Sequence, residues 1–419
     1  MKNIIAVGID VSKGKSTIAA MKVGGEIVLV PFDVNHSITE LNILVKTLRK
    51  LEGDVRIVME HTGAYYLPVA RTLISAGFFV CVVHALLIHD FGNNSIRRGK
   101  TDKKDAVKIA NYALANWSSL LPQQAQDEIR QELKTLNRQL SLYTKCETAL
   151  KNNLIALLDG SFPGANKLFS PETRANGHEK WVDFAERFWH RDCVCSLSRN
   201  AFSESYRKWC KKSGARWSAD KANEIYDYAR TQMATTQKNE TAKLIIVQAV
   251  TQLNALLETV HTIQQEMSRL AQMLPEYETV LAMNGVGKIL APQLIAEIGD
   301  VTRFHSKRAL TAFAGLNSPP HQSGQFEYKA RKISKRGSPH LRAALFRVAS
   351  MLIINQPEDD TVFQFLCKKR AEGKHYFVYM TAAANKFLRY YYGRVRECLT
   401  AVSAAKEACA AYTVEVRSA

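Results

Sequence analysis

Four acidic residues have the types and the order expected of a metal-dependent site. They are Asp10 in GIDVSK, Glu60 in VMEHTG, and Asp102 and Asp105 in KTDKKDA. Carboxylate oxygens are the ligands that Mg²⁺, or Mn²⁺ in its place, prefers in proteins. The chain around them is basic, with 57 Lys and Arg against 39 Asp and Glu and a net charge of +18. Carboxylates gathered in a basic protein predict metal ions acting on a phosphodiester backbone, and therefore a nucleic-acid partner.

The elements that must position these acids can be read from the first 116 residues. The hydrophobic pattern predicts strands over 4–10, 16–23, 26–34, 54–61 and 78–85. Helices are expected from a Ser37 cap to about residue 50, over 64–76, and from a Thr101 cap to about residue 116. This is the order of an α/β, RNase H-like domain. Asp10 ends the first strand, Glu60 nearly ends the fourth, and Asp102 and Asp105 share one face of a helical first turn. Helix capping would explain the last two acids but leaves Asp10 and Glu60 unexplained.

The middle of the chain carries heptad spacing over 129–157 and again over 246–274, which predicts a coiled coil. The two helices can pair within one chain or between chains. A mostly helical, Trp-rich insertion is expected at about 160–237, without assigned chemistry. The predicted domains are a catalytic domain over 1–118, the coiled coil with its insertion over 119–275, and a mostly helical C-terminal domain over 276–419.

The C-terminal domain holds two further candidate regions. Residues 278–299 match a helix-hairpin-helix pattern, in which Gly285, Gly287 and Lys288 would contact a phosphate; an αα-hairpin whose glycines only make the turn is the alternative. The stretch NSPPHQSGQFEYKARKISKRGSPHLR contains Ser323, a hydroxyl nucleophile for which no His/Asp partner is evident.

Basic residues near both regions are predicted to contact nucleic acid, with solvated surface charge as the alternative for each. They are Lys13, Arg97, Arg98, Lys100, Lys103 and Lys104 beside the acids, and Lys332, Lys335, Arg336 and Arg342 beside Ser323.

Hydropathy and cysteine usage predict where the protein acts. The longest apolar run, 78–88, is too short to span a bilayer, and the eight cysteines show no disulfide framework. We therefore expect no membrane partner and a reducing cytoplasmic location. A prokaryotic cell, with action at the nucleoid, is implied only by the family resemblance described in the next paragraph.

The motifs together resemble the DEDD-type transposases of an insertion-sequence family, related to the Piv-type DNA invertases. The matches are GIDVSK, the ME-TG around Glu60, KTDKKDA, GVG, AGL-N-P, QSG-F and ISKRGSPHLR. The resemblance implies a RuvC-like domain, a coiled coil and a C-terminal transposase domain. It implies that the four acids hold Mg²⁺ and that Ser323 forms a covalent link to DNA, with Ser334 as the fallback. It also implies donor and target double-stranded DNA, a structured guide RNA, and dimers and tetramers in which the serine of one subunit completes another subunit's acidic site.

Three other functions would use only part of these residues. A Holliday-junction resolvase would hydrolyse DNA with the four carboxylates alone and would not need Ser323. An actin-like ATPase or sugar kinase would need a second phosphate loop, which the sequence lacks, and would leave KTDKKDA without a role. A protein that only binds DNA or RNA would tolerate the loss of all four acids.

Overall fold

The computed structural model describes residues 3–91, 101–123, 128–170, 174, 177–318, 322–323, 326–327 and 332–418, with side chains up to 405 except those of 322–323 and 326–327. The chain divides into two compact units, residues 1–126 and 127–419. The first unit therefore ends eight residues beyond 118, the first domain limit expected from the sequence.

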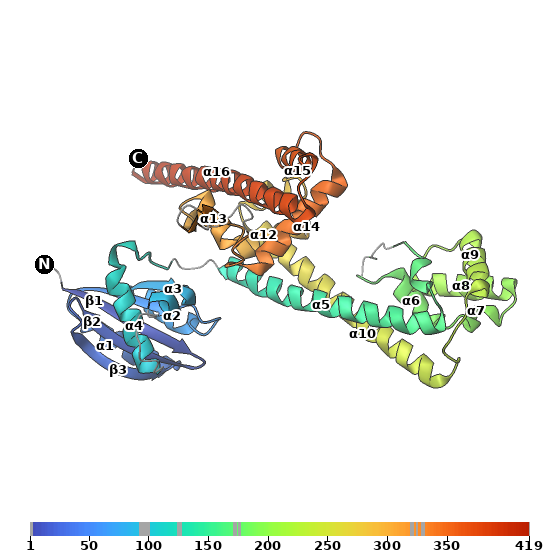
Figure 1. Ribbon diagram of the computed structural model, residues 1–419, viewed down its shortest axis with the longest axis horizontal. Coiled ribbons are helices and arrows are strands. Elements are labelled where there is room, and N and C mark those ends of the chain that lie inside the picture. The colour runs from blue at the N-terminus through green and yellow to red at the C-terminus, as the bar shows by residue number, and fades with distance from the viewer. Residues whose placement is uncertain are drawn as a thin grey trace. The chain divides into compact units, whose positions relative to one another are not determined.

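The first unit is built on a mixed five-stranded sheet (Figure 1). Its elements run β1 Ile4–Ser12, β2 Lys15–Lys22, β3 Ile27–Asn35, α1 Ile38–Arg49, β4 Asp54–Glu60, α2 Leu67–Ser75, β5 Phe79–Val83, α3 Ala85–Phe91 and α4 Asp102–Ala115. The strand order is β3-β2-β1-β4-β5; the first three strands are antiparallel neighbours, and β4 and β5 continue parallel to β1. This confirms the predicted α/β order. Helix α3 was not predicted.

The two faces of the sheet are covered by different helices. On one face, Ile5, Val7 and Ile9 of β1 point into a core made with α1 and α2. On the other face, Ala6 of β1 and Val58 of β4 pack against α3 and α4. Because side chains alternate along a strand, every second residue of β1 and β4 faces α4.

Helix α4 lies close against β1 because residue 8 has no side chain. A Cβ atom on Gly8 would stand 2.1 Å from the carbonyl oxygen of Ala106 and 2.4 Å from the amide nitrogen of Ala110. The helix starts as predicted, with the Thr101 hydroxyl accepting a hydrogen bond from the Lys104 amide. Its buried face is mostly alanine, so the helix backbone reaches the strand.

Two long helices, α5 Glu128–Ser161 and α10 Glu240–Gln272, form the stem of the second unit. Leu154 and Leu158 of α5 pack with Ile246 and Val250 of α10, whereas Leu133 at the other end of α5 shares a core with the last turns of α10. The helices therefore pair antiparallel within one chain (Figure 1). Of the two pairings left open by the sequence, the structure has the intrachain one.

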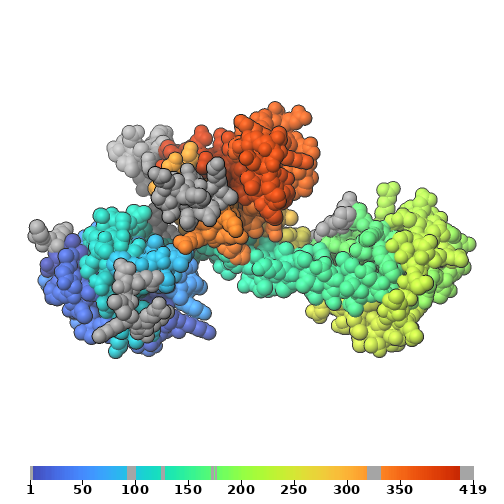
Figure 2. All heavy atoms as spheres, viewed as in Figure 1, coloured from blue at the N-terminus to red at the C-terminus, as the bar shows by residue number. Residues whose placement is uncertain are grey.

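The insertion forms a lobe of its own at the connected ends of α5 and α10 (Figure 2). Its helices are α6 Lys180–Arg187, α7 Asp192–Cys195, α8 Arg199–Ser213 and α9 Ala219–Thr231. Phe162, Phe184, Phe188, Phe202 and Tyr206 form its buried centre. Most of its aromatic rings are therefore core residues.

The remaining helices enclose the largest core. They are α11 Tyr277–Leu281, α12 Leu290–Ile298, α13 Lys307–Phe313, α14 Pro339–Asn355, α15 Thr361–Ala371 and α16 Tyr376–Ser418. Two short strands, β6 Gln322–Ser323 and β7 Phe326–Glu327, pair antiparallel, and short 3₁₀ helices lie at Trp117–Ser119, Ala165–Lys167 and Val301–Arg303. All nine residues of α12 are buried, so the other helices pack around it.

One helix of the described chain, α10, is long and apolar enough to cross a membrane by length and composition alone. Its apolar residues Ile246, Val250 and Leu253 are buried in the core shared with α5 and α6.

We predict that Gly8→Ala destabilises the first unit by about 1–3 kcal/mol or more, because the new methyl group meets backbone atoms that cannot rotate away. Hydrogen exchange of the peptide covering α4 should accelerate. Gly393→Ala in α16 is the control: its Cβ meets nothing within 4 Å, and the change should stabilise that helix by about 0.5–1 kcal/mol. Unchanged exchange in α4 would contradict the close contact.

Candidate functional site

Asp10 and Glu60 lie side by side at the carboxyl end of two parallel strands. The parallel register of β1 and β4 pairs Ile9 with Met59, so the next residue on each strand is one of the two acids. Both project from the face that α4 covers, two residues after Gly8 and Val58 respectively. Both are partly exposed. The sheet therefore brings together two acids that are 50 positions apart in the sequence.

The other two acids come from the first turn of α4. Asp102 is exposed and Asp105 half-buried. A lysine ties this turn to the sheet: Lys15 Nζ, at the start of β2, lies 4.0 Å from Asp102 Oδ2. Because β2 pairs Lys15 with Ser12 at the end of β1, Asp102 lies toward the edge of the sheet where Asp10 is found.

A fifth acid, Asp33 of β3, extends the row of polar residues across the sheet. The register pairs Asp10 with Thr17 and Thr17 with Asp33. The Thr17 hydroxyl donates to Asp33 at 2.7 Å, and Lys15 Nζ lies 3.0 Å from its other oxygen. The Thr17 hydrogen bond, with that of Lys15, holds the pKa of Asp33 below its ordinary value. Sequence reasoning missed Asp33, although an acid near the end of a predicted strand is the same signal that singled out Asp10.

The oxygen donors fit a hard divalent cation, but their side chains are not gathered at ligand distance. Among the described residues, no group of three or more His, Cys, Asp or Glu side chains is close enough to hold a metal. Carboxylates repel one another when no cation lies between them, and Lys15 neutralises only part of their charge. The residues could hold Mg²⁺ only after their side chains move toward one another.

The structure describes three of the six basic residues predicted to contact nucleic acid beside the acids, and the contacts themselves stay a prediction. Lys13, Lys103 and Lys104 are exposed. Arg97, Arg98 and Lys100 lie outside the described residues.

Ser323 lies on a short strand, within a segment whose two ends are joined by hydrogen bonds. Strands β6 and β7 pair Ser323 with Phe326. At the base, the Ser334 amide donates to the carbonyl oxygen of Asn317 at 2.8 Å, and the Ser334 hydroxyl donates to Asn317 Oδ1 at 2.6 Å. The AGL-N and ISKRG motifs are therefore in direct contact, and Ser334 has a structural role at the base of the loop.

A buried carboxylate holds the ISKRGS segment to the core. Glu297 of α12 accepts hydrogen bonds from Asn137 Nδ2 at 2.7 Å, Arg138 Nη2 at 3.0 Å and the Ser338 hydroxyl at 2.8 Å. The Ser338 hydroxyl also accepts from the Leu341 amide and caps α14. One carboxylate thus joins α5, α12 and the start of α14.

The basic residues of this region differ in their availability for a ligand. Lys332, Lys335 and Arg336 are exposed. Arg342 is half-buried and donates to the carbonyl oxygens of Ala314 and Gly337, so it stabilises the loop base.

In the GVG loop before α12, one residue serves packing and others are open to solvent. Gly285 has a φ of +77°, and a Cβ there would stand 2.9 Å from the Val348 carbonyl oxygen, so this glycine allows close packing on α14. Gly287 and Lys288 are exposed. The helices that flank the loop are α11 and α12, and the helix-hairpin-helix interpretation stays a prediction.

Comparison with protein families identifies two matching segments. Residues 7–163 match the DEDD transposase model of the IS110 type, and residues 277–364 match the transposase IS116/IS110/IS902 family. Together they make up more than half of the chain. The chain belongs to this IS110-type family of insertion-sequence transposases. It is an enzyme that cuts and rejoins DNA, as the resemblance in the motifs implied.

Curated relatives extend over most of this transposase. It is 24% identical to the 43.6 kDa protein of insertion element IS110 from Streptomyces coelicolor, over 88% of each chain. It is 22% identical to the pilin gene-inverting protein of Moraxella lacunata, over 85% of each chain. Among solved structures, RuvC of Thermus thermophilus in complex with a Holliday junction matches 29% of this chain and 99% of its own, with 13% identity and a TM-score of 0.24.

We predict that Glu297→Ala lowers the free energy of unfolding of the second unit by about 3–5 kcal/mol, because it leaves buried polar groups and a cation without their acceptor. Urea denaturation of the full chain measures this loss. The control is Glu266→Ala, which removes an exposed ion pair to Arg269 on α10 and should change stability little. Equal effects of the two variants would show that Glu297 does not hold the core together.

Proposed function

We propose that this transposase exchanges DNA strands through a covalent link between Ser323 and DNA, formed beside a metal-dependent site made by Asp10, Glu60, Asp102 and Asp105. The observation that supports this most directly is the adjacency of Asp10 and Glu60 at one sheet edge, with α4 held over the same face. That adjacency supports a site in which oxygen ligands from two strands would share one metal ion and, through it, one phosphate.

The four carboxylates would hold Mg²⁺, or Mn²⁺ in its place. When bound, the metal would supply Lewis-acid stabilisation of negative charge on the phosphodiester oxygens. Lys15 lies beside Asp102, and the exposed Lys103 and Lys104 come directly after Asp102 in the sequence. These cationic groups would be available to hold the DNA backbone near the acids.

In the covalent step, the Ser323 oxygen forms a bond to phosphorus while the bond to one deoxyribose oxygen breaks. The serine proton passes to a base or solvent, and the departing hydroxyl takes up a proton. The hydroxyl of a second strand then attacks the same phosphorus and releases the serine. Each bond formed replaces one of the same kind, so strands are exchanged without an external energy source.

The second unit favours this reaction over hydrolysis by a RuvC-like resolvase. A resolvase would use the acids of the first unit alone. Here the family match at 277–364 lies entirely in the second unit and includes Ser323, Ser334 and the segment between them.

The remaining assignments follow from the same proposal. Donor and target double-stranded DNA are the substrates, a structured RNA from the element guides them together, and the chain acts as a homodimer or homotetramer at the nucleoid. The net charge of +18 supports binding of more than one nucleic-acid segment.

We predict that Asp10→Asn and Asp105→Asn each lower the rate of strand cleavage in Mg²⁺ by about 10²-fold or more, because each removes a charged ligand from the site. EDTA should abolish cleavage by the unaltered chain. A gel assay with labelled DNA from the flanks of the element measures this. Glu52→Gln, an exposed acid of the same unit, is the control and should cleave normally. Full cleavage by Asp10→Asn would refute the carboxylate site.

We predict that Ser323→Ala abolishes the covalent protein–DNA adduct on a denaturing gel while binding to DNA and RNA stays within about twofold. Ser334→Ala is the matched control: its hydroxyl bonds to Asn317, so the adduct should still form. An adduct with Ser323→Ala that disappears with Ser334→Ala would move the nucleophile to Ser334. Cleaved DNA without an adduct in any of these proteins would favour hydrolysis.

A further inference from the structure

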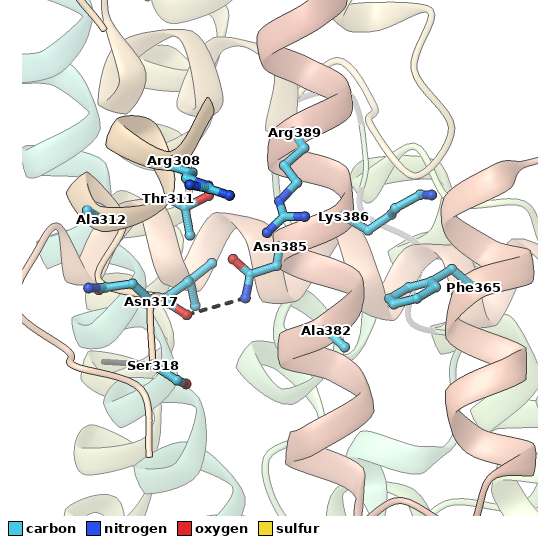
Figure 3. Close-up of a pocket in the computed structure, with 11 residues that line it drawn as sticks. Arg308, Thr311, Ala312, Asn317, Ser318, Phe365, Ala382, Asn385, Lys386 and Arg389 are labelled. Carbon is cyan, nitrogen blue, oxygen red and sulfur yellow. Dashed lines mark hydrogen bonds between the residues drawn. The ribbon is translucent and has the colours of Figure 1, made fainter. Parts of the chain in front are cut away.

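The second unit contains a cavity of about 720 Å³ between α13, α16 and residues 316–318 (Figure 3). Arg308 enters its lining from α13, Asn385, Lys386 and Arg389 from α16, and Phe365 from α15. Figure 3 shows Arg308 and Arg389 extending into the space between α13 and α16, with Asn385 below Arg389. The volume lies within the range of about 300–1,000 Å³ that is typical of sites for small molecules or parts of larger ones.

The charge of the lining is entirely positive. Arg308, Lys386 and Arg389 contribute three cations, and no acidic residue lines the cavity. Within the described chain, none of the three forms an ion pair. Cations held near one another without a counterion favour an anionic ligand. A phosphate group is the anion for which arginine geometry is best suited.

The Asn385 amide calls for a ligand that carries a hydrogen-bond donor, which a phosphate group alone does not have. Its Nδ2 donates to the Leu316 carbonyl oxygen at 3.3 Å. A carbonyl oxygen can only accept, so this bond fixes the orientation of the amide and leaves Oδ1 as a buried acceptor without a partner among the described residues. The missing partner is a donor. A phosphodiester has no donor, whereas the edges of unpaired bases carry N–H groups.

We propose that this cavity binds one unpaired nucleotide of a DNA strand. The strand's phosphates lie against Arg308 and Arg389, and a base N–H donates to Asn385 Oδ1. The inference rests on the proposed function for its choice of DNA. Ser318 lines the cavity and precedes Ser323 by five residues, so their Cα atoms lie at most about 18 Å apart. The nucleotide would therefore be held near the strand that Ser323 attacks.

Binding should be measured by fluorescence anisotropy in EDTA, so that no strand is cut. The probe is a labelled single-stranded DNA of about 20 nucleotides, compared with its duplex, with RNA of the same sequence, and with a DNA carrying a central abasic run. The variants are the double Arg308→Gln and Arg389→Gln, the single Asn385→Ala, and the control Arg394→Gln. Arg394 is exposed on the same helix, pairs with Glu397 and lies outside the cavity.

The double variant should bind single-stranded DNA about tenfold more weakly, and its slope of log K against log salt should fall by about 1.4, as expected for two lost phosphate contacts. Asn385→Ala should weaken binding to the DNA that carries bases and leave the abasic DNA unaffected. The control should match the unaltered chain.

Three outcomes would overturn the proposal. The first is that Arg394→Gln weakens DNA binding as much as the double variant does. The second is that the double variant loses affinity only for RNA or only for duplex DNA. The third is that Asn385→Ala weakens binding to abasic DNA as much as to the DNA that carries bases. Because no covalent step takes part, these results are independent of the adduct assay. The adduct can form on Ser323 even if the cavity binds nothing.

Discussion

The close approach of α4 to β1 fixes the candidate acidic site. Two acids belong to the sheet and two to the first turn of the helix, so the spacing between the pairs depends on how near the helix axis comes to the strand. At Gly8 the backbone of the strand lies directly against the backbone of α4, because any side chain would meet Ala106 and Ala110. Residues 8 and 10 point to the same face, so the glycine that lets the helix approach lies two positions before the candidate acid Asp10 on that face.

Electrostatics explains why the same geometry stops short of a closed metal site. Several carboxylates come from this edge of the sheet and from α4, and their mutual repulsion opposes further approach, while Lys15 offsets part of the charge. Lys15 is shared between Asp33 and Asp102, at 3.0 and 4.0 Å. Asp33 has a second donor in Thr17, so it retains a partner when Lys15 shifts. Lys15 thus bridges two acids on different elements, and Asp33 keeps its Thr17 hydrogen bond whichever of the two acids the lysine approaches.

Sequence predicted the parts of the fold that depend on local pattern. Three features depend only on residues that are close in the sequence: the strand alternation, the Thr101 cap and the long amphipathic helices. The structure confirms them. Relations between distant residues were not accessible. The register that aligns Asp33 with Asp10 is set by β2, and the pairing of Asn317 with Ser334 joins two motifs that sequence could only name separately. Gly285 shows the same limit, because its contact with α14 lies more than 60 positions away.

The loop that bears Ser323 combines a fixed base with a short paired tip. Its base is held twice by Asn317 and Ser334, and Glu297 anchors the next turn through Ser338 to a helix that is buried throughout. The two ends of the segment that contains Ser323 are therefore fixed to the helical core by hydrogen bonds. Because Glu297 also bonds Asn137 and Arg138 of α5, the same carboxylate that anchors this base ties it to the stem of the second unit.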